Sequence, residues 1–181
     1  MDQVYIIEDL VGEQDLKSVI SYLNNNDVSI DESGYSPFGV YTGNNGTQDL
    51  HIAFDNNYKK AKKIIEDSFQ CKVHDEGMTS IVELKTGDSM PVHLDHGSAA
   101  NKSVGLKTGA GHPTRDISSV LYYNDNYEGG EIYFPNQDLL IKPKPGMFIC
   151  FPAKDQFPHQ VKEIKSGYRW CSTAFWCIKK D

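Results

Sequence analysis

The sequence lacks the features that mark membrane, secreted and nucleic-acid-binding proteins. No apolar run approaches the roughly 20 residues that a membrane-spanning helix needs. The N-terminal stretch MDQVYIIEDL has neither a basic start nor a small-residue cleavage site, so we expect no signal peptide and a soluble, cytoplasmic protein. The 181 residues carry a net charge of -7, which argues against nucleic acid as a partner.

Cysteine is sparse, and its spacing excludes the common metal and redox motifs. The four cysteines include no Cys-x-x-Cys pair, and three of them fall within apolar, strand-like segments. This pattern is typical of buried free thiols in a reducing compartment. The four residues are Cys71, Cys150, Cys171 and Cys177.

The first part of the chain carries the helical patterns. Residues 4–7 have the character of a short strand, and apolar residues recur at helical spacing over residues 13–23 and again over residues 58–69. Residues 31–50, which lie between these helices, are rich in Gly, Asn, Ser and Tyr and show no period. They are predicted to form a long loop of the kind that serves as a lid.

From residue 78 onward the pattern changes to short strand-like runs separated by Gly, Pro and Asn, which is typical of a β-sandwich or jelly roll. We therefore expect a mainly β protein with supporting helices (α+β), built as one domain over residues 1–181. Residues 1–77 supply helical support and the lid loop, and residues 78–181 supply the jelly-roll core. The eight predicted strands are 80–85, 91–95, 117–123, 131–134, 139–141, 146–151, 159–164 and 168–178.

A candidate metal site begins with His93-Leu94-Asp95 at the end of one predicted strand. Because residues i and i+2 of a strand point to the same face, the imidazole and the carboxylate should converge on one point. His159, at the start of a distant strand, is the best candidate for a third ligand, and Arg169 follows ten residues later. Two histidines and one carboxylate form the facial set that holds non-haem Fe(II) and leaves coordination positions open.

A polar, glycine-rich insertion, residues 96–116, follows the first two candidate ligands directly. It contains His96 and Arg115, which we expect to be solvated loop residues or contacts to substrate. His96 should point away from the metal if the preceding strand continues. The insertion and the loop at residues 31–50 are predicted to close over the substrate.

Three further stretches flank the candidate ligands in order: Ser119–Glu131 (SVLYYNDNYEGGE), Pro145–Pro152 (PGMFICFP) and Gly167–Arg169 (GYR). In these motifs the chain resembles the Fe(II)/2-oxoglutarate-dependent dioxygenases, and within them the prolyl 4-hydroxylase-like branch. The resemblance covers about residues 78–177. It implies a double-stranded β-helix, the jelly roll of that family, packed on N-terminal helices. The metal ligands that it implies, which are also the catalytic residues, are His93, Asp95 and His159.

The resemblance also implies a binding site for 2-oxoglutarate. One end of this cosubstrate would chelate Fe(II), and its other carboxylate would pair with Arg169, whose planar fork suits a carboxylate. Tyr122 matches the family tyrosine that reaches the same carboxylate, although a core aromatic is the alternative. Thr173 shares a strand face with Arg169 and either donates its hydroxyl near the cosubstrate or packs in the core. Dioxygen is the other cosubstrate implied, with ascorbate as an accessory reductant.

The activity that the resemblance favours is hydroxylation of an unactivated C–H bond. Its branch implies a prolyl 4-hydroxylase, similar to procollagen-proline 4-dioxygenase, that acts on proline in a peptide or protein. A free amino acid or another small molecule is the alternative substrate. A rival from another class is a non-catalytic, cupin-like or lectin-like jelly-roll binding module, which would explain the strands but not the ordered His, Asp, His and Arg. We expect no membrane partner and either a monomer or a homodimer.

Overall fold

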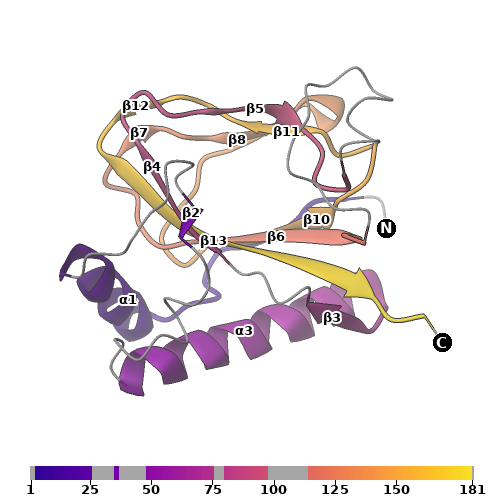
Figure 1. Cartoon of the computed structure of the whole chain (residues 1–181), viewed down its shortest axis with the longest axis horizontal. Helices are drawn as coiled ribbons and strands as arrows, with labels where there is room; N and C mark the ends of the chain where they lie inside the picture. The colour runs from indigo at the N-terminus through magenta and orange to yellow at the C-terminus, as the bar shows by residue number, and fades with distance from the viewer. Residues whose placement is uncertain (1–2, 26–34, 37–47, 76–79, 98–113, 181) are drawn as a thin grey trace.

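Two antiparallel sheets face each other, and two helices, α1 (Glu13–Asn25) and α3 (Gln48–Phe69), lie under the larger sheet (Figure 1). The computed structural model describes residues 3–25, 35–36, 48–75, 80–97 and 114–180. The predicted architecture, a mainly β jelly-roll core with supporting N-terminal helices, is confirmed. That residues 1–181 form a single domain stays a prediction.

The larger sheet runs in the order β1 (Tyr5–Ile7), β10 (Phe148–Pro152), β6 (Ile117–Tyr122), β13 (Tyr168–Ile178), β4 (Ser80–Lys85) and β2 (Tyr35–Ser36), and β3 (Val73–Asp75) pairs with the far end of β13. The smaller sheet runs β5 (Met90–His93), β11 (His159–Val161), β8 (Ile132–Phe134) and β9 (Leu139–Ile141). A two-stranded ribbon joins β12 (Ile164–Ser166) to β7 (Glu128–Gly129), and a short 3-10 turn, η1, covers Pro135–Gln137.

Strand β13 separates two hydrophobic cores because its side chains alternate between the faces of the larger sheet. Trp170, Ala174 and Trp176 face the helices, where they pack with buried residues of α1 and α3. Cys171 faces the smaller sheet and packs in the second core, which lies between the two sheets. The second core matters for function, because the candidate site residues from β6 and β13 lie on this inner face.

Strand bounds were predicted well, and helix bounds less well. The predicted strands 80–85, 139–141 and 168–178 are confirmed as β4, β9 and β13. Helix α3 begins ten residues before the predicted start at residue 58. The added part includes Asn57, which is buried within the helix, so tertiary packing overrides its low helix propensity.

Other differences concern short or irregular elements. The predicted strand 159–164 divides into β11 and β12, which belong to different sheets. The turn predicted at the Gly129-Gly130 pair contains the two-residue strand β7, and β3 was not predicted. Of the two predicted lid loops, residues 37–47 and 98–113 lie outside the described residues, so their closure over substrate stays a prediction.

The cysteines and the helices bear on two of the expectations from sequence. All four cysteines are free, and all but the half-buried Cys71 are buried, as predicted. None of the helices in the described residues has the length and apolar character that a membrane crossing requires.

Asn124, just beyond the end of β6, ties this strand to the beginning of β13. Its amide nitrogen donates to the carbonyl of Tyr168 at 2.8 Å, and its amide oxygen accepts from the backbone N–H of Trp170 at 2.7 Å. These two bonds bracket Arg169. The side chain is only 7% exposed, so water cannot easily replace either bond.

Replacement of Asn124 by alanine should therefore destabilise the fold by about 1–3 kcal/mol, the usual cost of leaving buried backbone groups unpaired. Urea titration followed by circular dichroism measures the change in the free energy of unfolding. The control is Asn136→Ala, which removes one surface contact to the carbonyl of Gln156 and should change this free energy by less than about 0.5 kcal/mol. Equal stabilities for the two variants would contradict the role assigned to Asn124.

Candidate active site

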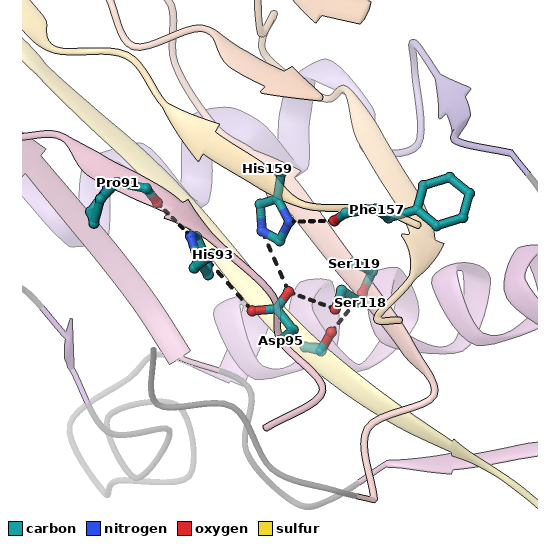
Figure 2. Close-up of polar contacts among 8 residues, drawn as sticks. Pro91, His93, Asp95, Ser118, Ser119, Phe157 and His159 are labelled. Atoms are coloured by element: carbon teal, nitrogen blue, oxygen red, sulfur yellow. Dashed lines mark hydrogen bonds and ion pairs between the residues drawn. The ribbon is translucent and has the colours of Figure 1, made fainter. Parts of the chain in front are cut away.

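His93, Asp95 and His159 converge at one end of a cavity between the two sheets (Figure 2). His93 ends β5, His159 begins β11, and the two are direct partners in the antiparallel pairing. Asp95 Oδ1 lies 3.6 Å from His93 Nε2, and Asp95 Oδ2 lies 3.5 Å from His159 Nε2. The structure thus brings the three predicted ligands together, with one potential ligand atom of each within 4.8 Å of the others.

Asp95 does not lie on the strand, as the argument from i and i+2 spacing had assumed. Strand β5 ends at His93, and Asp95 follows in a bend. The carboxylate nevertheless turns toward the histidines. Convergence therefore depends on the bend and on contacts to other strands, and the strand face alone does not explain it.

Both histidines are held in the tautomer that a metal ligand needs. Nδ1 of His93 donates to the carbonyl of Pro91 at 2.8 Å, and Nδ1 of His159 donates to the carbonyl of Phe157 at 3.2 Å. A carbonyl only accepts, so Nδ1 carries the proton and Nε2 keeps its lone pair. Two imidazoles and one carboxylate are a donor set that suits Fe(II), so the residues present fit this metal.

Burial and neighbouring groups set the protonation states at this end of the cavity. Burial lowers the pKa of His159 to about 4, despite the attraction of Asp95, so the ring is neutral at neutral pH. Burial opposes ionisation of Asp95, but the effects of His159, His93 and the Ser118 hydroxyl outweigh it and hold the pKa of Asp95 below its ordinary value. Metal binding requires these states, a neutral imidazole and an ionised carboxylate.

Arg169 lies in the same cavity, further along β13, and is only 2% exposed. One terminal nitrogen donates to the carbonyl of Gly130 at 2.8 Å, the other contacts the thiol of Cys171 at 3.9 Å, and Nε has no partner. Within the described part of the chain, no carboxylate forms an ion pair with it. Burial of a cation without an anion costs free energy, so this end of the cavity favours an anionic ligand.

Tyr122 and Thr173 also line this cavity, and their binding of the cosubstrate stays a prediction. The Tyr122 ring lies 5.5 Å from the guanidinium carbon of Arg169, and burial raises its pKa, so the phenol remains a hydrogen-bond donor. The Thr173 hydroxyl oxygen is buried and has no partner. The cavity, of about 60 Å³, has apolar walls that include Val82, Val120, Ile132 and Val161.

Gly130 and Tyr127, which lie between two predicted strands, pack beside Arg169. Gly130 has φ of +68°, and a Cβ there would lie 3.0 Å from the Tyr127 ring and 3.5 Å from Arg169 Cδ. The Tyr127 hydroxyl is buried and without a partner. Only the Gly-Gly pair signalled this role in the sequence, since glycine is favoured where φ is positive and backbone approaches closely.

Arg115 differs most from its expected position in a solvated loop. It is 7% exposed, and its guanidinium carbon lies 3.6 Å from the ring centre of Phe175, which lines the cavity. His96 is not among the clustered ligands, and its Nδ1 donates to the carbonyl of Arg115 at 2.7 Å. Stacking on an aromatic ring across the sheet is a long-range contact that sequence spacing does not reveal.

The low pKa of His159 predicts a pH dependence for the stability of the metal-free protein. In the unfolded chain His159 has the ordinary pKa of 6.5, whereas in the folded chain its pKa is about 4. The free energy of unfolding should therefore keep its full value above pH 6.5 and should fall by as much as about 3 kcal/mol as the pH drops toward 4. Urea titrations in the presence of a chelator measure this, and His159→Asn should flatten the profile. Parallel profiles for wild type and variant would contradict the assignment.

Comparison with solved structures places the fold among prolyl hydroxylases. The viral collagen prolyl hydroxylase of Paramecium bursaria Chlorella virus-1 superposes with a TM-score of 0.69 at 19% identity, covering 98% of this chain and 96% of that one. A Pseudomonas putida prolyl-4-hydroxylase gives 0.63 at 14% identity, with 99% and 95% covered. A Trichoplax adhaerens prolyl hydroxylase in complex with a hypoxia inducible factor peptide fragment gives 0.65 at 15% identity, with 98% and 84% covered. At these identities the likeness establishes the double-stranded β-helix fold alone.

Sequence comparison is more specific. Prolyl 3-hydroxylase 2 of Rattus norvegicus is 32% identical over 136 residues, which are 65% of this chain and 19% of that protein. Prolyl 3-hydroxylase 1 of Homo sapiens is 30% identical over 145 residues, 71% of this chain and 19% of that protein. The chain therefore spans about a fifth of the length of these relatives. Residues 79–177, more than half of the chain, match the family described as the 2OG-Fe(II) oxygenase superfamily, and the chain belongs to that superfamily, as its motifs had predicted.

Proposed function

We propose that this chain is an Fe(II)- and 2-oxoglutarate-dependent dioxygenase that hydroxylates proline within a peptide or protein. The observation that carries the proposal is the buried, unpaired Arg169 in the same cavity as His93, Asp95 and His159. A divalent metal, one ionised carboxylate and one arginine together have a net charge of about +2. A dicarboxylate such as 2-oxoglutarate neutralises this charge, and its length allows it to reach from the metal toward the arginine.

The polar residues of the cavity have separate roles in this proposal. His93, Asp95 and His159 would hold Fe(II), which, when bound, supplies the oxidising chemistry of dioxygen activation. Arg169 and the protonated phenol of Tyr122 bind the far carboxylate of the cosubstrate. The unpaired hydroxyl of Thr173 donates to an oxygen of the same ligand. The apolar walls exclude water and strengthen these polar contacts.

Proline as the substrate is supported by the relatives. The sequence relatives are named prolyl 3-hydroxylases, and the structural neighbours include prolyl 4-hydroxylases and a prolyl hydroxylase in complex with a peptide fragment. We retain 4-hydroxylation, the activity predicted from the motifs, as the proposed regiochemistry. A cytoplasmic location and a monomeric or homodimeric state also stay predictions.

A direct assay tests the activity and separates it from a non-catalytic binding module. Purified protein with Fe(II), 2-oxoglutarate and a proline-rich peptide should form succinate and hydroxyproline in equal amounts. Mass spectrometry against 3- and 4-hydroxyproline standards gives the position of the hydroxyl group. His93→Ala and His159→Ala should each reduce turnover by at least about 10²-fold and weaken Mn(II) binding, since a ligand nitrogen is lost. Succinate without hydroxyproline would point to a small-molecule substrate, and no succinate would favour the binding module.

Substitution of Arg169 tests the assignment of the cosubstrate. Arg169→Gln removes the charge that pairs with the far carboxylate and should raise the KM for 2-oxoglutarate by about 10²-fold, the loss expected for charge-assisted hydrogen bonds. Arg169→Lys should have a smaller effect because the charge remains. Affinity for Mn(II) without cosubstrate should stay within about threefold in both variants, since Arg169 is not among the clustered ligands. An unchanged KM in Arg169→Gln would remove the basis for the proposal.

A further inference from the structure

The three candidate metal ligands are not held in place by the same means. Each histidine is oriented locally, because its Nδ1 donates to the carbonyl two residues earlier in the chain, Pro91 for His93 and Phe157 for His159. Each histidine also lies on a paired strand, so the backbone that carries the ring is fixed by the smaller sheet. The two imidazoles are thus positioned before any metal binds.

Asp95 has neither of these supports. It lies beyond the end of β5, in a bend that leads into residues 98–113. A carboxylate in such a position rotates freely about its Cβ–Cγ bond unless another group holds it. The group that holds it is Ser118, whose hydroxyl donates to Asp95 Oδ2 at 2.7 Å (Figure 2).

Ser118 lies on an interior strand of the larger sheet. It is 1% exposed, and β6 is paired on both sides, with Ser118 opposite Phe151 of β10 and Phe175 of β13. Hydrogen bonds from a hydroxyl to an ionised carboxylate are short and are about twice as strong as neutral ones. The bond therefore transfers the rigidity of the larger sheet to the one candidate ligand that lies outside a strand.

We propose that Ser118 is a positioning residue for the metal, which fixes the rotation of the Asp95 carboxylate so that all three ligands are arranged before the metal binds. The proposal rests on the proposed function, since it requires a metal at this site. Partners of metal ligands typically alter affinity by 10- to 100-fold when they are removed. The predicted effect is on the affinity for the metal and not on the contacts around Arg169.

The test compares three variants by calorimetric titration of the chelator-treated protein with Mn(II). Ser118→Ala should bind Mn(II) 10- to 100-fold more weakly than wild type. Ser118→Thr keeps the hydroxyl and should stay within about threefold of wild type. The control is Ser172→Ala, which removes another buried serine hydroxyl of the same sheet, one that pairs with the Tyr123 hydroxyl at 2.6 Å. This variant should bind Mn(II) as wild type does.

A second measurement distinguishes positioning from general loss of stability. The visible absorption spectrum of bound Co(II) reports the geometry of its ligands, and it should change in Ser118→Ala but not in Ser118→Thr or Ser172→Ala. If Ser118→Ala does not fold, Ser118→Cys, whose thiol is a weaker donor, should show an intermediate affinity. Wild-type affinity and spectrum in Ser118→Ala or Ser118→Cys, or an equal loss in Ser172→Ala, would overturn the role of Ser118. A wild-type protein that binds no Mn(II) would instead overturn the proposed function together with it.

Discussion

The antiparallel pairing of β6 with β13 is the constraint on which the cavity depends. Its register places three pairs of inward-facing residues in sequence, first Ser118 with Phe175, then Val120 with Thr173, then Tyr122 with Cys171. The first pair lies at the end with the metal ligands, and the third lies beside Arg169. A slip of one residue would turn all of these side chains toward the helices, because the side-chain period of a strand is two residues.

The same pairing explains why the two ends of the cavity differ in charge. Asp95 is held at one end by β6, and Arg169 enters the other end from β13. The wall between them includes the apolar side chains of Val82, Val120, Ile132 and Val161, and the two groups form no ion pair with each other. Opposite polarity at two fixed points suits a ligand that brings an anionic group to each end when a divalent metal is present. The positions of the charged groups at the two ends, more than the shape of the cavity, therefore determine which ligand fits.

Much of this arrangement was predictable from the sequence, and the physical reasons are clear for each part. Strand β13 was predicted with its observed bounds, because a long run rich in aromatic and apolar residues between Gly167 and Lys179 is a strong local signal. The His93, Asp95, His159 and Arg169 set was readable because its members follow one another in a recognisable order. The contacts of Ser118 to Asp95 and of Arg115 to Phe175 were not predicted, because they span 23 and 60 residues and leave no local pattern.

Three buried polar atoms without partners lie where the ligand is expected. Arg169 Nε, Tyr127 Oη and the Thr173 hydroxyl all belong to the inner face or its immediate surroundings. The Tyr123–Ser172 and Trp176–Ser119 hydrogen bonds pair other polar groups of β6 and β13, whereas Trp170 Nε1, on the side of β13 that faces the helices, is buried without a partner. Each unpaired group lowers the stability of the protein, and a ligand that forms the missing hydrogen bond offsets that loss. Arg169 and Thr173 differ from Trp170 because they line the cavity, where a ligand reaches their unpaired atoms.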